Sequence, residues 1–293
     1  MGKKLIIMAR INEYMMRDRN PNVPYTPDEI ADTAAACEAA GASIIHFHAR
    51  NPDGSPSHDP NTYLEIISKI RARSAVVIDS TLGQNTVKGD HNRAAHIVAM
   101  EADPTKRADM AAIDVGSTNI DVYDTERHAF RTTDKTYVNT IGTCMFLAQA
   151  MDKAGVKPHL TCWAVPFLKG ADALLDMGVF KQPAYVQFAF CEGGIIGGHS
   201  CTIEDTLAFV RALPRDKRIE WTVTCKEGNL LPAAAVAIER GGHLSPGIGD
   251  YPYPELGCPT NAELVRFFAQ LARAQGRETA TPGEARQMLG IAA

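Results

Sequence analysis

Short apolar runs alternate with longer amphipathic runs along the whole chain, and this alternation limits the possible folds more than any other feature. A strand, helix, strand repeat favours a parallel sheet, because parallel strands need a long crossover that is usually a helix. Eight strands are predicted, at Lys4–Ala9, Ser43–His48, Ala75–Asp79, Met110–Asp114, Lys157–Cys162, Tyr185–Phe190, Glu220–Cys225 and His243–Ser245.

The predicted helices lie between these strands, and the first two begin with clear capping signals. In residues 26–29, Thr-Pro-Asp-Glu, a threonine N-cap precedes a first-turn proline and two acids, and Asp59-Pro60 opens the second helix in the same way. The other helices are predicted at Asp90–Met100, Thr136–Ala154, Gly170–Met177, Ile203–Leu213, Leu230–Arg240 and Asn261–Gln275.

Eight strands alternating with eight helices predict a closed (β/α)8 TIM barrel, and a chain of 293 residues suits this fold as a single domain. An open doubly wound sheet is the alternative fold. It is disfavoured because residues 10–13, Arg-Ile-Asn-Glu, follow the first strand in place of a glycine-rich phosphate-binding turn. Residues from about 280 to 293 are expected to form a C-terminal helical extension capped at Thr281.

Charge and composition exclude several classes of partner. The net charge is −4 and no long basic run occurs, so nucleic acid and anionic membranes are poor candidates. No apolar stretch could span a bilayer or serve as a signal-peptide core, so a cytoplasmic protein is expected. Seven scattered cysteines without a Cys-x-x-Cys pair indicate reduced thiols.

His46 and His48 lie at the end of the second predicted strand and are the strongest signal for chemistry. Side chains alternate along a strand, so both imidazoles point to the same side and can bind one divalent metal ion. The simpler interpretation is a pair of hydrogen-bonded histidines on a polar barrel surface. The carboxyl end of a barrel strand is where active sites gather, which favours the metal.

The other predicted strands also end in polar residues, and these define the candidate site. Because the loops after the strands meet at one face of a barrel, we expect their side chains to surround one pocket. Glu13, Arg50 and Asp114 are candidates for contact with a substrate, together with Arg10, Asn12, Asp79, Ser80, Thr81, Ser117, Asn119, His159, Thr161, Glu192, Lys226, Glu227, Ser245 and Asp250.

Several of these segments resemble the β-keto acid cleavage enzymes, a family of zinc-dependent barrels. The matching segments are NPNVPYTPDEI at residues 20–30, AGA at 40–42 with HFHAR at 46–50, and GGH at 241–243 with Gly247 and Asp250. The order and spacing of these motifs cover nearly the whole chain.

The resemblance implies that a β-keto acid and acetyl-CoA, as cosubstrate, exchange acyl parts to give acetoacetate and a new acyl-CoA. It implies that His46 and His48 bind Zn²⁺, that Ser80 hydrogen-bonds the substrate, and that Asp250 removes a proton. Ser80 and Asp250 are thus the predicted catalytic residues. The partners would be a small β-keto acid and a CoA thioester, and the protein would be a homo-oligomer, a dimer or a tetramer.

The sequence also departs from the family pattern at four positions. Gly249 stands in place of a glutamate that is the third metal ligand, and Ser245 in place of an arginine that partners the aspartate. Ala112 and Thr161 replace a threonine and a glutamate. The loss of acidic groups suggests a substrate other than the amine-bearing keto acid that some members of the family cleave.

These departures leave the third metal ligand open. Asp250 or Glu13 are the first candidates, and His159 or Glu192 the next. If Asp250 binds the metal, Glu13 or Glu192 would have to act as the base. Lys226 or Arg10 could replace the missing arginine charge.

Two other functions are alternatives to the cleavage of β-keto acids. A metal-dependent hydrolase of the amidohydrolase type also uses His-x-His on a barrel strand, with later histidines such as His159 and His199. That class carries the motif on the first strand, whereas here it lies on the second. A non-catalytic protein that binds keto acids is the third hypothesis.

Overall fold

The computed structural model describes residues 2–83 and 86–292, and its central element is one sheet of eight parallel strands. Backbone hydrogen bonds from Leu244 N to Ile6 O (3.1 Å) and from Arg10 N to Pro246 O (2.9 Å) join the last strand to the first. The predicted barrel is therefore confirmed. In sheet order the strands are β1 Met8–Arg10, β2 Ile44–Phe47, β3 Val77–Ser80, β4 Met110–Asp114, β9 Lys157–Cys162, β10 Ala184–Cys191, β11 Ile219–Lys226 and β12 His243–Leu244.

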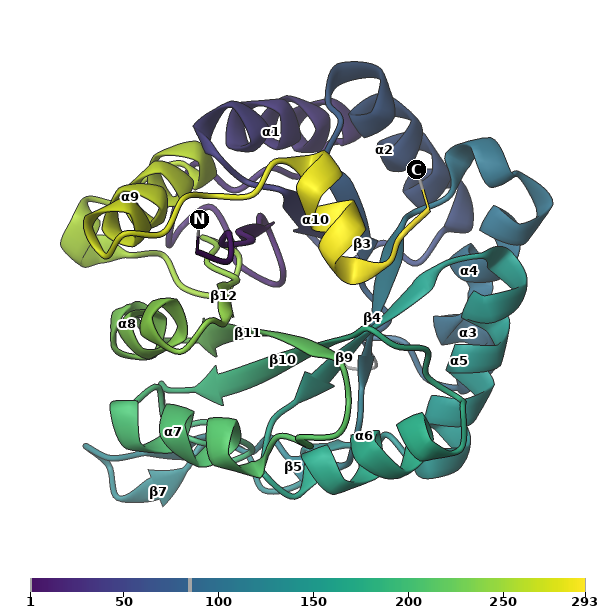
Figure 1. Cartoon of the computed structure of the whole chain (residues 1–293). Helices are drawn as coiled ribbons and strands as arrows, with labels where there is room; N and C mark the ends of the chain where they lie inside the picture. The colour runs from purple at the N-terminus through teal and green to yellow at the C-terminus, as the bar shows by residue number, and fades with distance from the viewer. Residues whose placement is uncertain (1, 84–85, 293) are drawn as a thin grey trace.

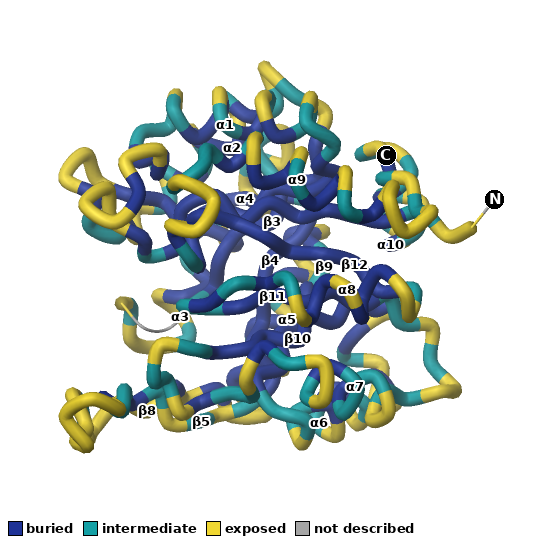
Figure 2. The backbone as a smooth tube through the Cα atoms, turned by 90° about the vertical axis from the view of Figure 1, so that its left-hand side faces the viewer, coloured by how far each residue is buried: buried dark blue, intermediate teal, exposed yellow. Residues whose placement is uncertain are grey.

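Helices surround the strands, as Figure 1 shows in a view along the barrel. In Figure 2 the strands form a buried centre, and the exposed backbone lies in the outer helix turns and loops. The helices are α1 Pro27–Ala40, α2 Pro60–Arg73, α3 Asp90–Arg93, α4 Ala95–Ala102, α5 Ile141–Ala154, α6 Phe167–Asp176, α7 Ile203–Ala212, α8 Leu231–Glu239, α9 Asn261–Ala274 and α10 Pro282–Leu289, with 3-10 turns at Pro104–Lys106 and Pro254–Leu256.

Local capping explains where the first two helices begin. The Thr26 side chain accepts a hydrogen bond from Glu29 N, and Glu29 bonds back to the Thr26 backbone, which satisfies amide groups that a helix leaves free at its start. Asp59 accepts from Asn61 N at the start of α2. Both starts agree with the sequence prediction.

The segment between β4 and α5 was predicted incompletely. The predicted helix at residues 136–154 was wrong at its start, because Thr136 and Tyr137 form strand β8 and Thr140 caps α5. Two small antiparallel sheets lie in this segment, and the sequence prediction missed both. They are formed by β5 Thr118–Asn119 with β8, and by β6 Tyr123–Asp124 with β7 Ala129–Phe130.

Other boundaries shift by a few residues. The first strand begins at Met8, not Lys4, since before Met8 only isolated bridges form, from Leu5 to Thr279 and from Ile7 to Leu244. The helix predicted over residues 90–100 is divided at Ala94 into α3 and α4, and α6 begins at Phe167, three residues before its predicted start.

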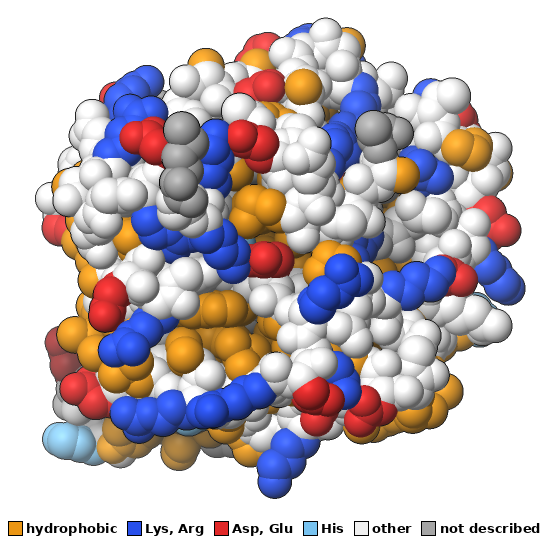
Figure 3. Space-filling model, in the orientation of Figure 1, with side chains coloured by type: hydrophobic (Ala, Val, Ile, Leu, Met, Phe, Trp, Pro, Cys, Tyr) orange, Lys and Arg blue, Asp and Glu red, His pale blue; other side chains and the backbone are white. Residues whose placement is uncertain are grey.

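Helix α10 covers the amino end of the barrel. Its Ala285 and Leu289 pack on Ile6, Met8 and Tyr185, and the helix lies at the front of the barrel in Figure 1. The same face is seen in Figure 3, where Lys, Arg, Asp and Glu side chains are mixed around a hollow with apolar walls. The carboxyl ends of the strands, where active sites of such barrels lie, are at the opposite face.

No helix among the described residues is long and apolar enough to cross a membrane.

Candidate metal centre and active site

Glu13, His46 and His48 meet at the carboxyl end of β1 and β2. One Glu13 oxygen, Oε1, lies 3.1 Å from His46 Nε2, and the other, Oε2, lies 2.7 Å from His48 Nε2. The ligand atoms of all three residues lie within 4.8 Å of one another, and all three are buried. A carboxylate between two imidazole nitrogens is a donor set that Zn²⁺ accepts.

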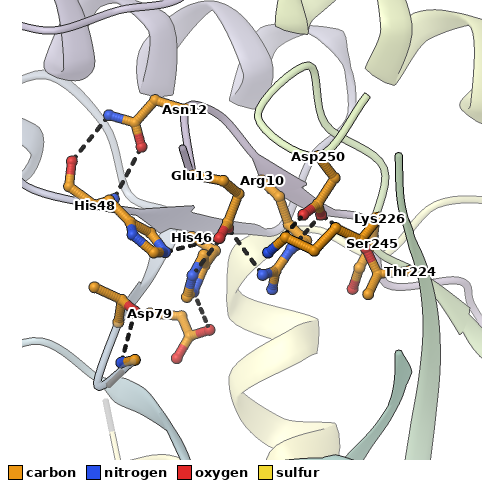
Figure 4. A network of polar contacts seen from close by, with 12 residues as sticks. Arg10, Asn12, Glu13, His46, His48, Asp79, Thr224, Lys226, Ser245 and Asp250 are labelled. Atoms are coloured by element: carbon orange, nitrogen blue, oxygen red, sulfur yellow. Dashed lines mark hydrogen bonds and ion pairs between the residues drawn. The ribbon is translucent and has the colours of Figure 1, made fainter. Parts of the chain in front are cut away.

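The orientation of His46 is fixed by a buried carboxylate behind it. Asp79 Oδ2 lies 2.9 Å from His46 Nδ1 and 2.9 Å from His159 Nδ1 (Figure 4 shows the first contact). In the tautomer whose Nδ1 donates this bond, His46 Nε2 would be free to bind a metal ion once it has lost its proton. Asp79 therefore fixes the orientation of the His46 ring.

The protonation of the three residues follows from burial and neighbouring charge. Burial would raise the pKa of Glu13, but Arg10 and the two histidines hold it well below its usual value. Burial lowers the pKa of His48 to about 4. Burial acts in the same direction on His46, but there the carboxylates of Glu13 and Asp79 prevail and raise the pKa to about 8. At neutral pH the group thus offers an ionised carboxylate and a neutral His48.

The loop that carries Glu13 is held by Arg50. The guanidinium donates to the backbone oxygens of Asn12 (3.0 Å), Met15 (2.9 Å) and Gly54 (2.6 Å), and to Glu13 O. Glu13 itself has φ of +30°, a conformation that costs a non-glycine residue roughly 1–3 kcal/mol and persists where surrounding contacts enforce it. These contacts fix the position of the Glu13 carboxylate.

Gly249 allows this loop to lie where it does. A Cβ atom at Gly249 would be 2.7 Å from Asn12 N, Asn12 C and Glu13 N, and Gly249 N donates to Arg10 O. The position where the family pattern has a glutamate is therefore filled by the backbone of the first loop. The carboxylate of that loop, Glu13, reaches the histidines instead.

We expect Gly249→Ala to destabilise the protein by about 1–3 kcal/mol, because the added methyl must push the backbone of the Glu13 loop away. Thermal and urea unfolding would measure this loss. Gly283→Ala is the control, since a Cβ atom there meets nothing within 4 Å and lies in α10, where alanine is favoured. Equal stability of the Gly249→Ala protein and the parent would contradict this explanation of the glycine.

Asp250 lies beside the metal candidate and is held by a cation from the first strand. Arg10 Nε donates to Asp250 Oδ2 (2.7 Å), and Arg10 Nη2 lies 2.9 Å from Glu13 Oε1, as Figure 4 shows. Thr224 Oγ1 also donates to Oδ2 (3.0 Å), whereas Oδ1 lies 3.9 Å from Lys226 Nζ. Of the two cations that the sequence left open, Arg10 takes the place of the arginine missing at Ser245. The Ser245 hydroxyl instead bonds Thr222.

A cavity opens in front of these groups. Asp114 from β4 and Lys226 from β11 line it, as the strand-end pattern predicted. The sequence did not single out Tyr137, Trp163 or Gln187 as site residues. The full lining is Arg10, Glu13, Tyr14, His46, His48, Thr81, Gly83, Ala112, Asp114, Tyr137, Thr161, Trp163, Gln187, Ala189, Phe190, Cys191, Thr224, Lys226 and Asp250.

Ser80 and Arg50 are not on this cavity surface. Asp79 points at His46 inside the barrel, so the alternation of side chains turns Ser80 outward, beside Phe47. Thr81 lines the cavity in its place. The Arg50 guanidinium already donates to backbone carbonyl oxygens of the loop that carries Glu13. This geometry therefore does not support direct contact of Ser80 or Arg50 with a substrate.

The remaining candidates for a third ligand also have other partners. His159 bonds Asp79, and Glu192 Oε1 accepts from Cys201 N (2.8 Å). His199, which a hydrolase of the amidohydrolase type could use, bonds Asp205. The arrangement therefore favours Glu13 among the alternatives.

Cys191 is the one cysteine on the cavity wall among the described residues. Burial raises the pKa of its thiol to about 12, so it is protonated at neutral pH and a poor nucleophile. The chemistry of the site thus depends on the histidines and carboxylates.

The chain matches a known protein family over almost its full length. The family model described as beta-keto acid cleavage enzyme matches residues 4–291. The chain belongs to this family. This confirms the resemblance seen in the sequence and, at the level of the family, the prediction of an acyltransferase that cleaves carbon–carbon bonds.

Two curated relatives of this family member span nearly its full length. A 3-keto-5-aminohexanoate cleavage enzyme of Acetoanaerobium sticklandii is 32% identical over 99% of both chains. A 3,5-dioxohexanoate:acetyl-CoA acetone transferase of Paraburkholderia graminis is 29% identical over 99% of this chain and 96% of its own. Among solved structures, apo ObcA superposes with a TM-score of 0.69 at 15% identity, over 93% of this chain and 66% of that one, which shows a shared fold.

Proposed function

We propose that the protein uses a divalent metal ion, Zn²⁺, to transfer acyl groups between a β-keto acid and acetyl-CoA. The products would be acetoacetate and a new acyl-CoA. The observation that carries this proposal is the Glu13 carboxylate between the Nε2 atoms of His46 and His48. Glu13 Oε1 and His46 Nε2 are buried and lie 3.1 Å apart without a well-aligned hydrogen bond among the described residues, and Arg10 Nη2 is the cation beside Oε1, which fits a site that can accept a metal ion.

Each residue of the site has a role in this proposal. A bound cation would polarise the keto group and so acidify the protons on C2. Asp250 would take one of these protons through Oδ1, because Oδ2 is already held by Arg10 and Thr224. Arg10 stays paired with Asp250 and Glu13 and keeps both carboxylates in place.

Two acyl transfers would follow the removal of this proton. C2 of the keto acid, having lost its proton to Asp250, attacks the acetyl carbonyl of acetyl-CoA, and the CoA thiolate leaves. The thiolate then attacks the original keto carbon, the bond between that carbon and C2 breaks, and a new acyl-CoA forms. Asp250 returns the proton to C2, which completes acetoacetate. Lys226, 3.9 Å from Asp250 Oδ1, lies where it can stabilise negative charge during these steps.

The two curated relatives support the choice of substrates, since both of their names contain a 3-keto acid and one also contains acetyl-CoA. The cytoplasmic location and the homo-oligomer expected from the sequence stay predictions.

Metal removal tests the proposed function. We expect the purified protein to form acetoacetate from acetyl-CoA and at least one of a panel of 3-keto acids, to lose this activity after chelation, and to regain it with Zn²⁺. The new acyl-CoA should appear in equal amount by mass spectrometry. Full activity after chelation, with no metal detectable in the protein, would contradict the proposal.

A further inference from the structure

We propose that His159 is a positioning residue for the metal centre, and that it acts on the candidate ligand His46 through the carboxylate of Asp79. This inference rests on the proposed function, because it requires that His46 binds a metal ion. The observation behind it is a single buried carboxylate oxygen that two imidazole rings share.

Asp79 Oδ2 is the oxygen that both rings contact. It lies 2.9 Å from Nδ1 of His46 and 2.9 Å from Nδ1 of His159. The second oxygen of this carboxylate, Oδ1, has no hydrogen-bond partner among the described residues. All three side chains are buried. In the described parts of the chain, His46 and His159 are therefore the two side chains that hold the Asp79 carboxylate.

The shared oxygen makes the orientation of one ring depend on the other. The last torsion of an aspartate side chain has broad minima, so a carboxylate that is held on one side only can turn. With His159 in place, Oδ2 lies between the two Nδ1 atoms and accepts from both. Without His159 the carboxylate can turn, and the ring of His46, whose Nε2 lies 3.1 Å from Glu13 Oε1, loses a fixed partner.

His159 itself lies away from the chemistry. It does not line the cavity, and it is not part of the group of close ligand atoms that Glu13, His46 and His48 form. Its ring lies inside the barrel beside Tyr185, with centroids 5.2 Å apart, and its Nε2 has no hydrogen-bond partner among the described residues. The bond to Asp79 is therefore the route by which His159 can affect the site.

A small residue on the intervening strand leaves space for this bond. In sheet order β4 lies between β3, which carries Asp79, and β9, which carries His159. Ala112 of β4 is in register with His159 and lines the cavity, so its side chain is on the inner side of the barrel. The family pattern has a threonine at this position, and the smaller alanine leaves room for the His159 ring to reach Asp79 across β4.

Two substitutions of nearly equal shape test this inference. The amide nitrogen of asparagine can donate from a position close to that of His159 Nδ1, whereas leucine has no donor. Competition with a metal-binding dye measures Co²⁺ affinity, and the visible absorption of bound Co²⁺ reports the geometry of its ligands. We expect His159→Leu to lower Co²⁺ affinity about tenfold or more and to change this absorption. His159→Asn should keep the absorption of the parent and stay within about threefold of its affinity.

His243→Leu is the matched control for the loss of a buried histidine. His243 is also fully buried and bonds a carboxylate, since its Nε2 lies 2.8 Å from Glu220 Oε2, but this pair is separate from Asp79 and from the metal candidate. We expect His243→Leu to lower the thermal stability of the protein and to leave Co²⁺ affinity and absorption like those of the parent.

A measurement on the unsubstituted protein covers the case in which the variants do not fold. In proton–nitrogen correlation spectra of the Zn²⁺-loaded protein with isotope-labelled histidine, the ring in contact with Tyr185 identifies His159. We expect its proton on Nδ1. An unprotonated Nδ1, parent-like Co²⁺ binding by His159→Leu, or an equal loss of affinity in His159→Asn or His243→Leu would overturn the inference. Failure of the proposed function would appear separately, as an unsubstituted protein that binds neither Co²⁺ nor Zn²⁺.

Discussion

Replacing Glu13 with glutamine is expected to lower Zn²⁺ affinity by roughly a hundredfold or more and to remove most of the turnover. Loss of a group that merely supports a metal ligand costs about 10–100-fold in affinity, so loss of a direct ligand should cost at least the upper value. Glutamine keeps the size of the side chain but not its charge. Competition with a zinc-binding dye would measure the affinity.

Glu192→Gln is the matched control for this change. Glu192 was a candidate ligand on sequence grounds, but its carboxylate bonds Cys201 N and it is not part of the cavity lining. We expect this variant to bind zinc like the parent. A larger loss of zinc from Glu192→Gln than from Glu13→Gln would show that the wrong acid has been assigned to the metal.

Asp250→Asn is expected to lower kcat by about 10²–10⁴-fold, the usual effect of removing a general base. The bound metal should stay, because Asp250 contacts Arg10, Thr224 and Lys226 and not the histidines. Steady-state assays of acetoacetate formation would give kcat, and metal analysis would show whether the site is still filled.

Thr224→Val tests the hydrogen bond that supports Asp250 while the Asp250 carboxylate itself is kept. Valine removes one hydrogen bond to Asp250 Oδ2 and leaves the carboxylate and Arg10 in place, so we expect a loss of less than about tenfold. If Asp250→Asn kept kcat within a few fold of the parent, proton removal would have to be assigned to another group.

The parts of the site that follow from local pattern could be predicted from the sequence. His46 and His48 share one side of a strand because side chains alternate, whatever the rest of the chain does. The barrel followed from the repeated alternation of strands and helices, and the caps at Thr26 and Asp59 fixed two helix starts.

The parts that depend on contacts between distant segments could not be predicted. Glu13 was one acid among several until the path of its loop was known, and that path depends on Arg50 and on the space at Gly249. Pairing of Arg10 with Asp250 joins residues 240 positions apart.

At two further positions the sequence allowed more than one local structure, and the prediction differed from the structure. The end of the third strand offered both Asp79 and Ser80, and only the register with His46 shows which of them faces the inside of the barrel. Tyr137 looked like part of a helix, but it pairs with Thr118 in a small sheet and so reaches Asp114.

The most direct test of the central claim is a crystal structure of the protein prepared with Zn²⁺, with anomalous difference maps recorded on both sides of the zinc absorption edge. We predict one peak that appears only above the edge, at bonding distance from His46 Nε2, His48 Nε2 and a Glu13 oxygen, with Asp250 still paired to Arg10. A map without a peak between the two imidazoles, or a metal ion held by Asp250 in place of Glu13, would contradict this account.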